Sequence, residues 1–331
     1  KLHAIGEDVL DGMMQAIDEA ERNCKGLIIW QTEPPFSVGA NLSGGGTRKD
    51  APKPSALGAM MKKFKRSAES AVLKAARKLN VADALMAGRL EKVESVVEQF
   101  QATSQALRYS MIPTVAAVDG MALGGGCEFV MHADRAVASL ESYIGLVEAG
   151  VGLLPAGGGC KEFAMRAAAE AKGADVFPFL KNYFQNVATA QVGKSAEHSR
   201  ELGYLRASDR VVMNRFELLH VAKAELHALA ESGYRPPLKS RTIPAAGRSA
   251  IATFKMAMAN MLAGGQISEH DFLIGSKVAY VLCGGDIEAG TPVTEDWYLD
   301  LERQAFMELI ATEKTQARIE HTLKTGKPLR N

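Results

Sequence analysis

The sequence predicts an α/β fold in which short buried strands lead into helices. Two apolar, β-branched runs support this prediction, residues 26–31 (GLIIWQ) and residues 113–119 (PTVAAVD), because buried strands of parallel sheets have this composition. The second run continues through the glycine triplet 124–126 into residues 127–133, which we expect to be helical. Strands that feed helices in this way indicate the α/β class.

The glycine triplet is the first candidate functional feature. Glycine loses the most backbone entropy on folding, so adjacent glycines indicate a positive φ or a close approach, and we favour a ligand lying against the main chain. A helix that starts here directs unpaired N–H groups outward, where they can stabilise an oxyanion, and Gly125 is the candidate donor. Glu128 lies three positions later, on the same helical face. The spacing therefore joins an oxyanion donor to an acid or base.

A second carboxylate and a second donor lie elsewhere in the chain. Glu148 follows a strand-like run, residues 142–147, and enters a glycine-rich turn, which is where catalytic side chains concentrate. After the first predicted strand comes the segment PPFSVGANL, residues 34–42, in which Gly39 again permits close approach. The N–H group of Ala40 is the candidate second oxyanion donor.

Together these segments resemble the crotonase superfamily of enoyl-CoA hydratases and isomerases. Residues 112–128 (IPTVAAVDGMALGGGCE) are similar to the family block KPVIAAVNGYALGGGCE, and residues 36–42 (FSVGANL) to FSAGADL. Glu148 stands where the hydratases have their second glutamate, and residues 152–158 resemble LGTIPGAGG. Asn41 replaces the usual aspartate, and Val147 replaces the proline that precedes the glutamate in hydratases. The resemblance implies the crotonase spiral of ββα turns with a helical C-terminal lobe.

The resemblance also implies residue roles. Ala40 and Gly125 would form the oxyanion hole, Glu128 would activate water, and Glu148 would donate the proton. Substrate contacts are implied for residues next to these donors, namely Val38, Asn41 and Gly124. Because both glutamates are present, the expected reaction is the syn hydration of a trans-2-enoyl-CoA in fatty-acid β-oxidation, with acyl-CoA as substrate. A Δ3-Δ2-enoyl-CoA isomerase and a non-catalytic acyl-CoA-binding domain remain alternatives.

We expect a crotonase-like core over residues 1–215 and a helical lobe over residues 216–331. A helical insertion is expected at about residues 43–108. Its apolar residues at helical spacing either line the acyl site or only pack, and they are Met60, Met61, Phe64, Val93, Val97, Phe100 and Leu107. The family has strands before residue 1, so this chain resembles the C-terminal hydratase part of a fused enzyme whose N-terminal part is an NAD-dependent 3-hydroxyacyl-CoA dehydrogenase. We expect no cofactor in this segment, and NAD only in the linked dehydrogenase. Self-association remains open.

Composition argues against other function classes. A net charge of +1 gives no bulk electrostatic basis for nucleic-acid binding, and no apolar run has the length of a membrane span. The four cysteines are far apart, which predicts buried thiols rather than disulfides, and no metal site is expected. We expect a cytoplasmic location in a bacterium and a mitochondrial or peroxisomal one otherwise.

Overall fold

The computed structural model of the chain describes residues 3–40 and 81–331. Of these, residues 3–40 and 97–331 belong to one compact unit, and residues 81–96 belong to a second one. The predicted insertion is described from residue 81 onward, where a long helix, α3 (Val81–Arg108), ends just before the strand predicted at residues 113–119. The division into a core and a C-terminal lobe at residue 215 stays a prediction.

A four-stranded parallel sheet forms the centre of the larger unit, in the order β1-β2-β4-β6. The strands are β1 (Leu27–Trp30), β2 (Thr114–Val118), β4 (Arg135–Ser139) and β6 (Arg210–Val212). A parallel pair, β3 (Met121–Leu123) and β5 (Tyr143–Gly145), forms a second sheet. Every residue of β2 is buried, as its sequence predicts, whereas β1 is only half-buried and Trp30 is 40% exposed. The prediction of a buried β1 was therefore wrong in part, because β1 lies at the edge of the sheet.

The chain repeats a strand-strand-helix unit, which confirms the predicted α/β class and its ββα turns. Strands β2 and β3 lead into α4 (Gly125–His132). Strands β4 and β5 lead through a short 3-10 helix, η1 (Glu148–Val151), into α5 (Gly159–Ala171). The predicted helix at residues 127–133 thus exists and begins two residues earlier. Each predicted glutamate lies just after the second strand of a unit.

Helices cover the sheet. The amphipathic helix α8 (Leu218–Glu231) buries Leu218, Ala222 and Leu226 against Val115 and Val137 of the sheet. At the N-terminus, α1 (Glu7–Asn23) buries Leu10, Ile17 and Ala20. The remaining helices before α8 are α6 (Phe177–Ala188), α7 (Ala196–Glu201) and η2 (Arg215–Glu217).

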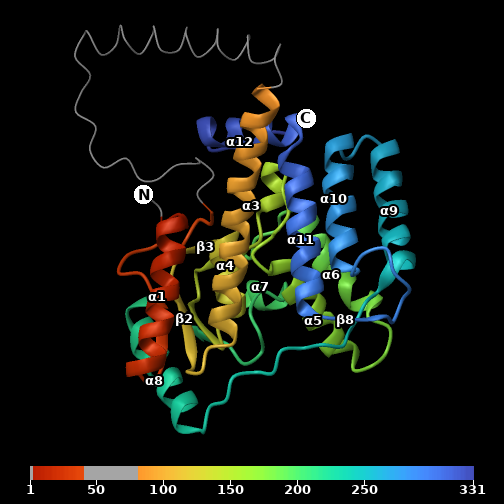
Figure 1. Cartoon of the computed structure of the whole chain (residues 1–331). Helices are drawn as coiled ribbons and strands as arrows, with labels where there is room; N and C mark the ends of the chain where they lie inside the picture. Colours follow the sequence, from red (N-terminus) through yellow and green to blue (C-terminus); the bar gives the residue numbers. More distant parts are fainter. Residues whose placement is uncertain (1–2, 41–80) are drawn as a thin grey trace, which may run out of the picture. The chain divides into compact units, whose positions relative to one another are not determined.

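The C-terminal segment is helical, as predicted, and packs on α5. It contains β7 (Ile243–Pro244), α9 (Gly247–Ala263), α10 (Glu269–Leu282), β8 (Pro292–Val293), α11 (Glu295–Ile310) and α12 (Glu313–Thr325). Figure 1 shows α9, α10 and α11 side by side on one flank, and both α10 and α11 contact α5. A small apolar cluster joins Ala164 of α5 to Ile243, Val293 and Tyr298.

The expectation of buried thiols has a mixed outcome. Cys127, Cys160 and Cys283 are buried and free, but Cys24 is exposed because it follows the last turn of α1. In the described ranges, no helix is long and apolar enough to cross a membrane. The same part of the chain contains no cluster of three residues that could hold a metal ion.

Candidate active site

The glycine triplet lies where three other segments meet. A Cβ atom on Gly124 would lie 2.8 Å from Glu148 Oε1, one on Gly125 would lie 2.6 Å from Phe100 Cζ, and one on Gly126 would lie 2.7 Å from Ser37 Cβ. Gly124 also has φ +54°, which L residues rarely adopt. The sequence favoured a ligand against these glycines, and the structure places protein side chains there. Glu148 is one of them, so the triplet brings the two predicted motifs together.

The two candidate oxyanion donors lie on adjacent backbones. Gly39 has φ +91°, and a Cβ atom on it would lie 2.8 Å from Leu123 O and 3.3 Å from Gly125 N. Ser37 anchors this loop, because its N–H donates to Met121 O and its carbonyl accepts from Leu123 N, both at 2.9 Å. The Gly125 N–H belongs to the first turn of α4, where the helix itself offers no acceptor.

Of the other predicted residues of this loop, the structure describes Ala40 and Val38. Ala40, directly after Gly39, is exposed and forms a parallel bridge with Ile5. Val38 is half-buried on the other side of Gly39, and Asn41 lies outside the described residues. The local geometry thus brings the backbone of Gly39 to α4 and leaves the oxyanion role of Ala40 as a prediction.

Glu128 is a buried carboxylate held by backbone donors. It is 3% exposed, and its Oε1 accepts hydrogen bonds from Gly157 N at 2.8 Å and Gly159 N at 2.9 Å. Burial raises the pKa of Glu128 to about 7, although the N–H groups of Gly159 and Gly157 and the charge of Lys161 each lower it. A carboxylate with this pKa exchanges protons near neutral pH.

Glu148 lies at the start of η1, and its side chain reaches Gly124. Its Oε2 is buried and accepts no hydrogen bond from any residue that the structure describes. Burial and then the charge of Glu128 together raise its pKa to about 8. The two glutamates therefore interact, and ionisation of one disfavours ionisation of the other.

Residues of the C-terminal helices hold both glutamate loops, which sequence reasoning missed. The buried Glu302 of α11 accepts from Gly158 N at 2.9 Å and from Lys161 N at 2.7 Å. Thr315 of α12 donates to Gly152 O at 2.8 Å, and Gly152 is the residue that ends η1. The available signal was a glutamate on the buried face of an amphipathic helix, since Leu299, Leu301 and Ala305 are buried on α11 as well.

Phe100 is a further residue near the glutamates. It is 7% exposed, stacks on Phe129 with ring centroids 4.9 Å apart, and would contact Cβ atoms added at Gly125 and Gly157. Helical spacing predicted Val93, Val97, Phe100 and Leu107 as an apolar face of the insertion, and all are buried except Val93, which is half-buried. The predicted residues Met60, Met61 and Phe64 lie outside the described residues.

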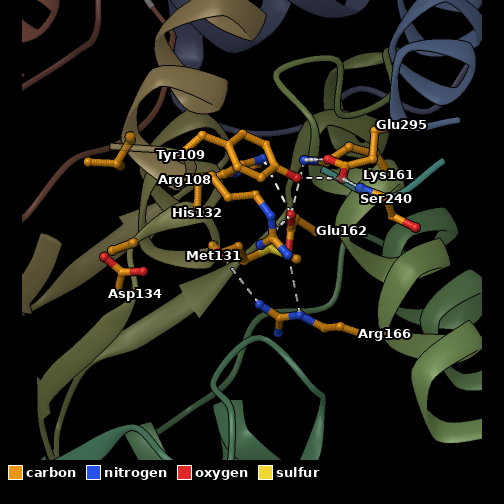
Figure 2. Close-up of polar contacts among 12 residues, drawn as sticks. Arg108, Tyr109, Met131, His132, Asp134, Lys161, Glu162, Arg166, Ser240 and Glu295 are labelled. Carbon is orange, nitrogen blue, oxygen red and sulfur yellow. Dashed lines mark hydrogen bonds and ion pairs between the residues drawn. The ribbon is translucent and has the colours of Figure 1, made fainter. Parts of the chain in front are cut away.

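A separate buried ion cluster joins α5 to α11 and the end of α3 (Figure 2). Lys161 Nζ lies 3.0 Å from Glu162 Oε1 and 3.4 Å from Glu295 Oε2, and all three side chains are at most 2% exposed. Arg108 Nη1 lies 2.9 Å from Glu162 Oε1, and Tyr109 donates to Glu295. Burial alone would raise the pKa of Glu162, but the charges of Lys161 and Arg108 hold it well below its usual value. The cluster is a polar cross-link between helices.

Beside this cluster is a cleft of about 330 Å³ that is lined by three arginines, Arg108, Arg166 and Arg206. Arg166 and Arg206 both donate to Met131 O, and Arg206 also donates to Ala133 O at 2.8 Å. These carbonyls end α4, where positive charge is favourable. The guanidinium groups therefore cap the helix that carries Glu128.

Comparisons with known proteins identify relatives of this chain. The family model for enoyl-CoA hydratase/isomerase matches residues 80–183, which contain both glutamates. A Bacillus subtilis protein named Probable 3-hydroxyacyl-CoA dehydrogenase is 37% identical over all 331 residues. A Rickettsia felis protein named Putative fatty acid oxidation complex trifunctional enzyme is 26% identical over 72% of this chain. The chain spans 37% of the length of the first relative and 29% of the second.

The fold also matches solved structures. A crystal structure of an enoyl-CoA hydratase/isomerase from Xanthobacter autotrophicus superposes with a TM-score of 0.52 at 16% identity, covering 98% of this chain and 86% of that one. At this identity the likeness shows the fold alone. The family model, the ββα units and the glycine-rich block agree, and they identify the part of the chain over residues 80–183 as a member of the crotonase superfamily of enoyl-CoA hydratases and isomerases.

Proposed function

We propose that this chain catalyses the reversible hydration of a trans-2-enoyl-CoA to a 3-hydroxyacyl-CoA. The observation that carries the proposal is the pair of carboxyl groups next to one glycine triplet, the buried Glu128 and the half-buried Glu148 with its buried Oε2, whose pKa values are raised to about 7 and about 8. Hydration needs a base and an acid at the same time, and near neutral pH this pair can hold one ionised and one protonated carboxyl group. We take Glu128 as the base and Glu148 as the acid, as the family resemblance implies.

The steps follow from these protonation states. Glu128 takes a proton from water while the water oxygen bonds to C3 of the enoyl group. The π electrons move toward the thioester oxygen, whose enolate charge the N–H groups of Gly125 and Ala40 would stabilise. Glu148 then delivers its proton to C2, and a proton passes from Glu128 to solvent as Glu148 is reprotonated. Val38, Asn41 and Gly124 would contact the substrate beside the donors.

The test is hydration of crotonyl-CoA, followed as loss of the conjugated enoyl-thioester absorbance. We expect Glu128→Gln and Glu148→Gln each to lower kcat about a hundredfold or more, which is the usual contribution of a positioned acid or base. Glu141→Gln is the matched control, because Glu141 is exposed seven positions before Glu148. Wild-type turnover in either active-site variant would refute the two-glutamate mechanism.

Isomerisation of a 3-enoyl-CoA to the 2-enoyl-CoA is a second candidate activity. It is favoured by the Oε2 atom of Glu148, which is buried and has no hydrogen-bond donor among the described residues. A single carboxyl group could carry a proton between C4 and C2 without Glu128. The two activities separate in Glu128→Gln, which should lose hydration and keep isomerisation. If the wild-type protein catalyses neither reaction but still binds CoA, the result would instead support a binding domain.

We also propose that the chain is covalently linked to an NAD-dependent 3-hydroxyacyl-CoA dehydrogenase. The relative from Bacillus, named as such a dehydrogenase, supports this, because the chain spans only 37% of its length. The product of hydration carries the 3-hydroxyl group that such an enzyme oxidises. Intact-mass measurement on protein from the natural source tests the linkage, and a mass near 35.5 kDa would refute it.

A further inference from the structure

Glu302 binds the same backbone turn as Glu128, although 174 positions separate them in the sequence. Along this turn the donors alternate. Gly157 N and Gly159 N donate to Glu128, whereas Gly158 N and Lys161 N donate to Glu302, at distances between 2.7 and 2.9 Å. Glu302 is fully buried. One turn therefore holds two carboxylates from two different helices.

The turn needs both carboxylates to keep its shape. It opens α5, whose N-cap residue Gly158 has φ +109° and no side-chain cap, so the first N–H groups of the helix depend on outside acceptors. The positive end of the helix dipole favours carboxylates here. If one carboxylate oxygen of Glu302 is removed, a buried N–H group loses its acceptor, and the backbone of the turn can shift to find another one. That relaxation would move the two N–H groups that hold Glu128.

The surroundings of Glu302 contain few other charges. Glu128 of α4 faces it across the turn, Lys161 of α5 lies on the turn itself, and the thiol of Cys160 lies beside it. Burial, and then the charge of Glu128, raise the pKa of Glu302 well above its usual value. The raised pKa reduces the negative charge that Glu302 places beside Glu128.

We propose that Glu302 is a positioning residue, which fixes the turn of residues 157–161 and so holds the Glu128 carboxylate in its reactive orientation. The inference rests on the proposed function, because the orientation matters for catalysis only if Glu128 acts there as a base. It assigns to the C-terminal helices a part in the active site.

The test replaces Glu302 by glutamine, which keeps the side-chain volume but presents an NH₂ group to one of the two N–H donors. We expect kcat for hydration to fall about tenfold with little change in KM, because the base is misoriented and the substrate site is intact. The Gly157 and Gly159 hydrogen bonds lower the pKa of Glu128, so weakening them raises it. The acidic limb of the kcat/KM profile should therefore move up by about one pH unit.

The control is Glu308→Gln on the same helix, where the exposed Glu308 pairs with Lys277. It should leave kcat and the pH profile unchanged. A readout independent of activity is ¹³C NMR of protein labelled at the glutamate carboxyl carbons, in which Glu128→Gln identifies the Glu128 signal. If the wild type does not hydrate enoyl-CoA, the proposed function fails, yet this titration still decides whether Glu302 positions Glu128.

An unchanged Glu128 midpoint in Glu302→Gln would overturn the inference, because Glu302 would then support only the fold. A lower midpoint would overturn it as well, since charge repulsion rather than turn geometry would dominate. Should Glu302→Gln fail to fold, the reciprocal titration decides. The pKa of Glu302 must fall in Glu128→Gln, because the charge of Glu128 raises it. The Glu302 signal is identified by its absence in Glu302→Asp. An unchanged pKa would show that the two carboxylates do not share one turn.

Discussion

Replacement of Gly124 by alanine tests the contact between the glycine turn and Glu148. Gly124 has φ +54° and ψ −125°, a conformation that costs an L residue about 1 to 3 kcal/mol. Its new Cβ atom would lie 2.8 Å from Glu148 Oε1, whereas a comfortable contact is about 3.5 Å, so the carboxylate must move by about 0.7 Å. A misplacement of about 1 Å at a reacting group costs about a hundredfold in rate. We therefore expect Gly124→Ala to lose between about one and two orders of magnitude in kcat for crotonyl-CoA hydration.

The control is Gly265→Ala, because Gly265 has φ +67° and a Cβ atom there would meet nothing within 4 Å. It carries a backbone penalty of about 1 kcal/mol without a clash. Thermal unfolding should register both variants, while only Gly124→Ala should lose activity at a temperature where both are folded. Full activity in Gly124→Ala, or an equal loss in Gly265→Ala, would refute the argument from the Glu148 contact.

Four further outcomes are expected. The kcat/KM profile for hydration should be bell-shaped, with limbs near pH 7 and pH 8 that belong to the Glu128–Glu148 pair; a single limb would contradict the paired roles. In ¹³C titrations, Glu128→Gln should lower the pKa of Glu148, because a charge that raises it is gone. The free energy of unfolding should fall by about 3 kcal/mol from Glu128 alone between pH 4.5 and 7, since only the folded state keeps that proton; urea titrations that show no such difference from Glu128→Gln would contradict this. Thr315→Val should lower kcat and leave KM unchanged, because Gly152 O loses its donor, and equal changes in both would point to the substrate site instead.

The parts of the site that lie within one ββα unit could be predicted from the sequence. The glycine triplet requires a helix start, and the three-residue spacing places Glu128 on the first turn of that helix. Glu148 was predicted from its place after a strand, and the structure adds that its side chain lies against Gly124. The positions of these residues on the fold could be predicted because strand, turn and helix are specified by neighbouring residues.

The contacts between remote segments could not be predicted in this way. Nothing near Glu302 or Thr315 indicates that their partners are the turns at Gly158 and Gly152, because the pairing depends on how α11 and α12 pack. The half-buried β1 was missed for the same reason, since an apolar run does not reveal whether a strand has one neighbour or two. The exposed Cys24 shows that residue type alone does not fix burial at a helix end.

The hydrogen bonds that join α11 and α12 to the turns at Gly158 and Gly152 have a consequence for the order of folding. The hydrogen bond from Gly158 to Glu302 spans 144 positions and the one from Thr315 to Gly152 spans 163. During synthesis the ββα units leave the ribosome long before these acceptors and donors exist, and contacts of such separation form late because their loops are costly to close. A nascent chain would thus contain the glycine-rich turn and both glutamates before the hydrogen bonds that position them could form. Catalytic competence would be acquired at the end of folding, together with the last helices.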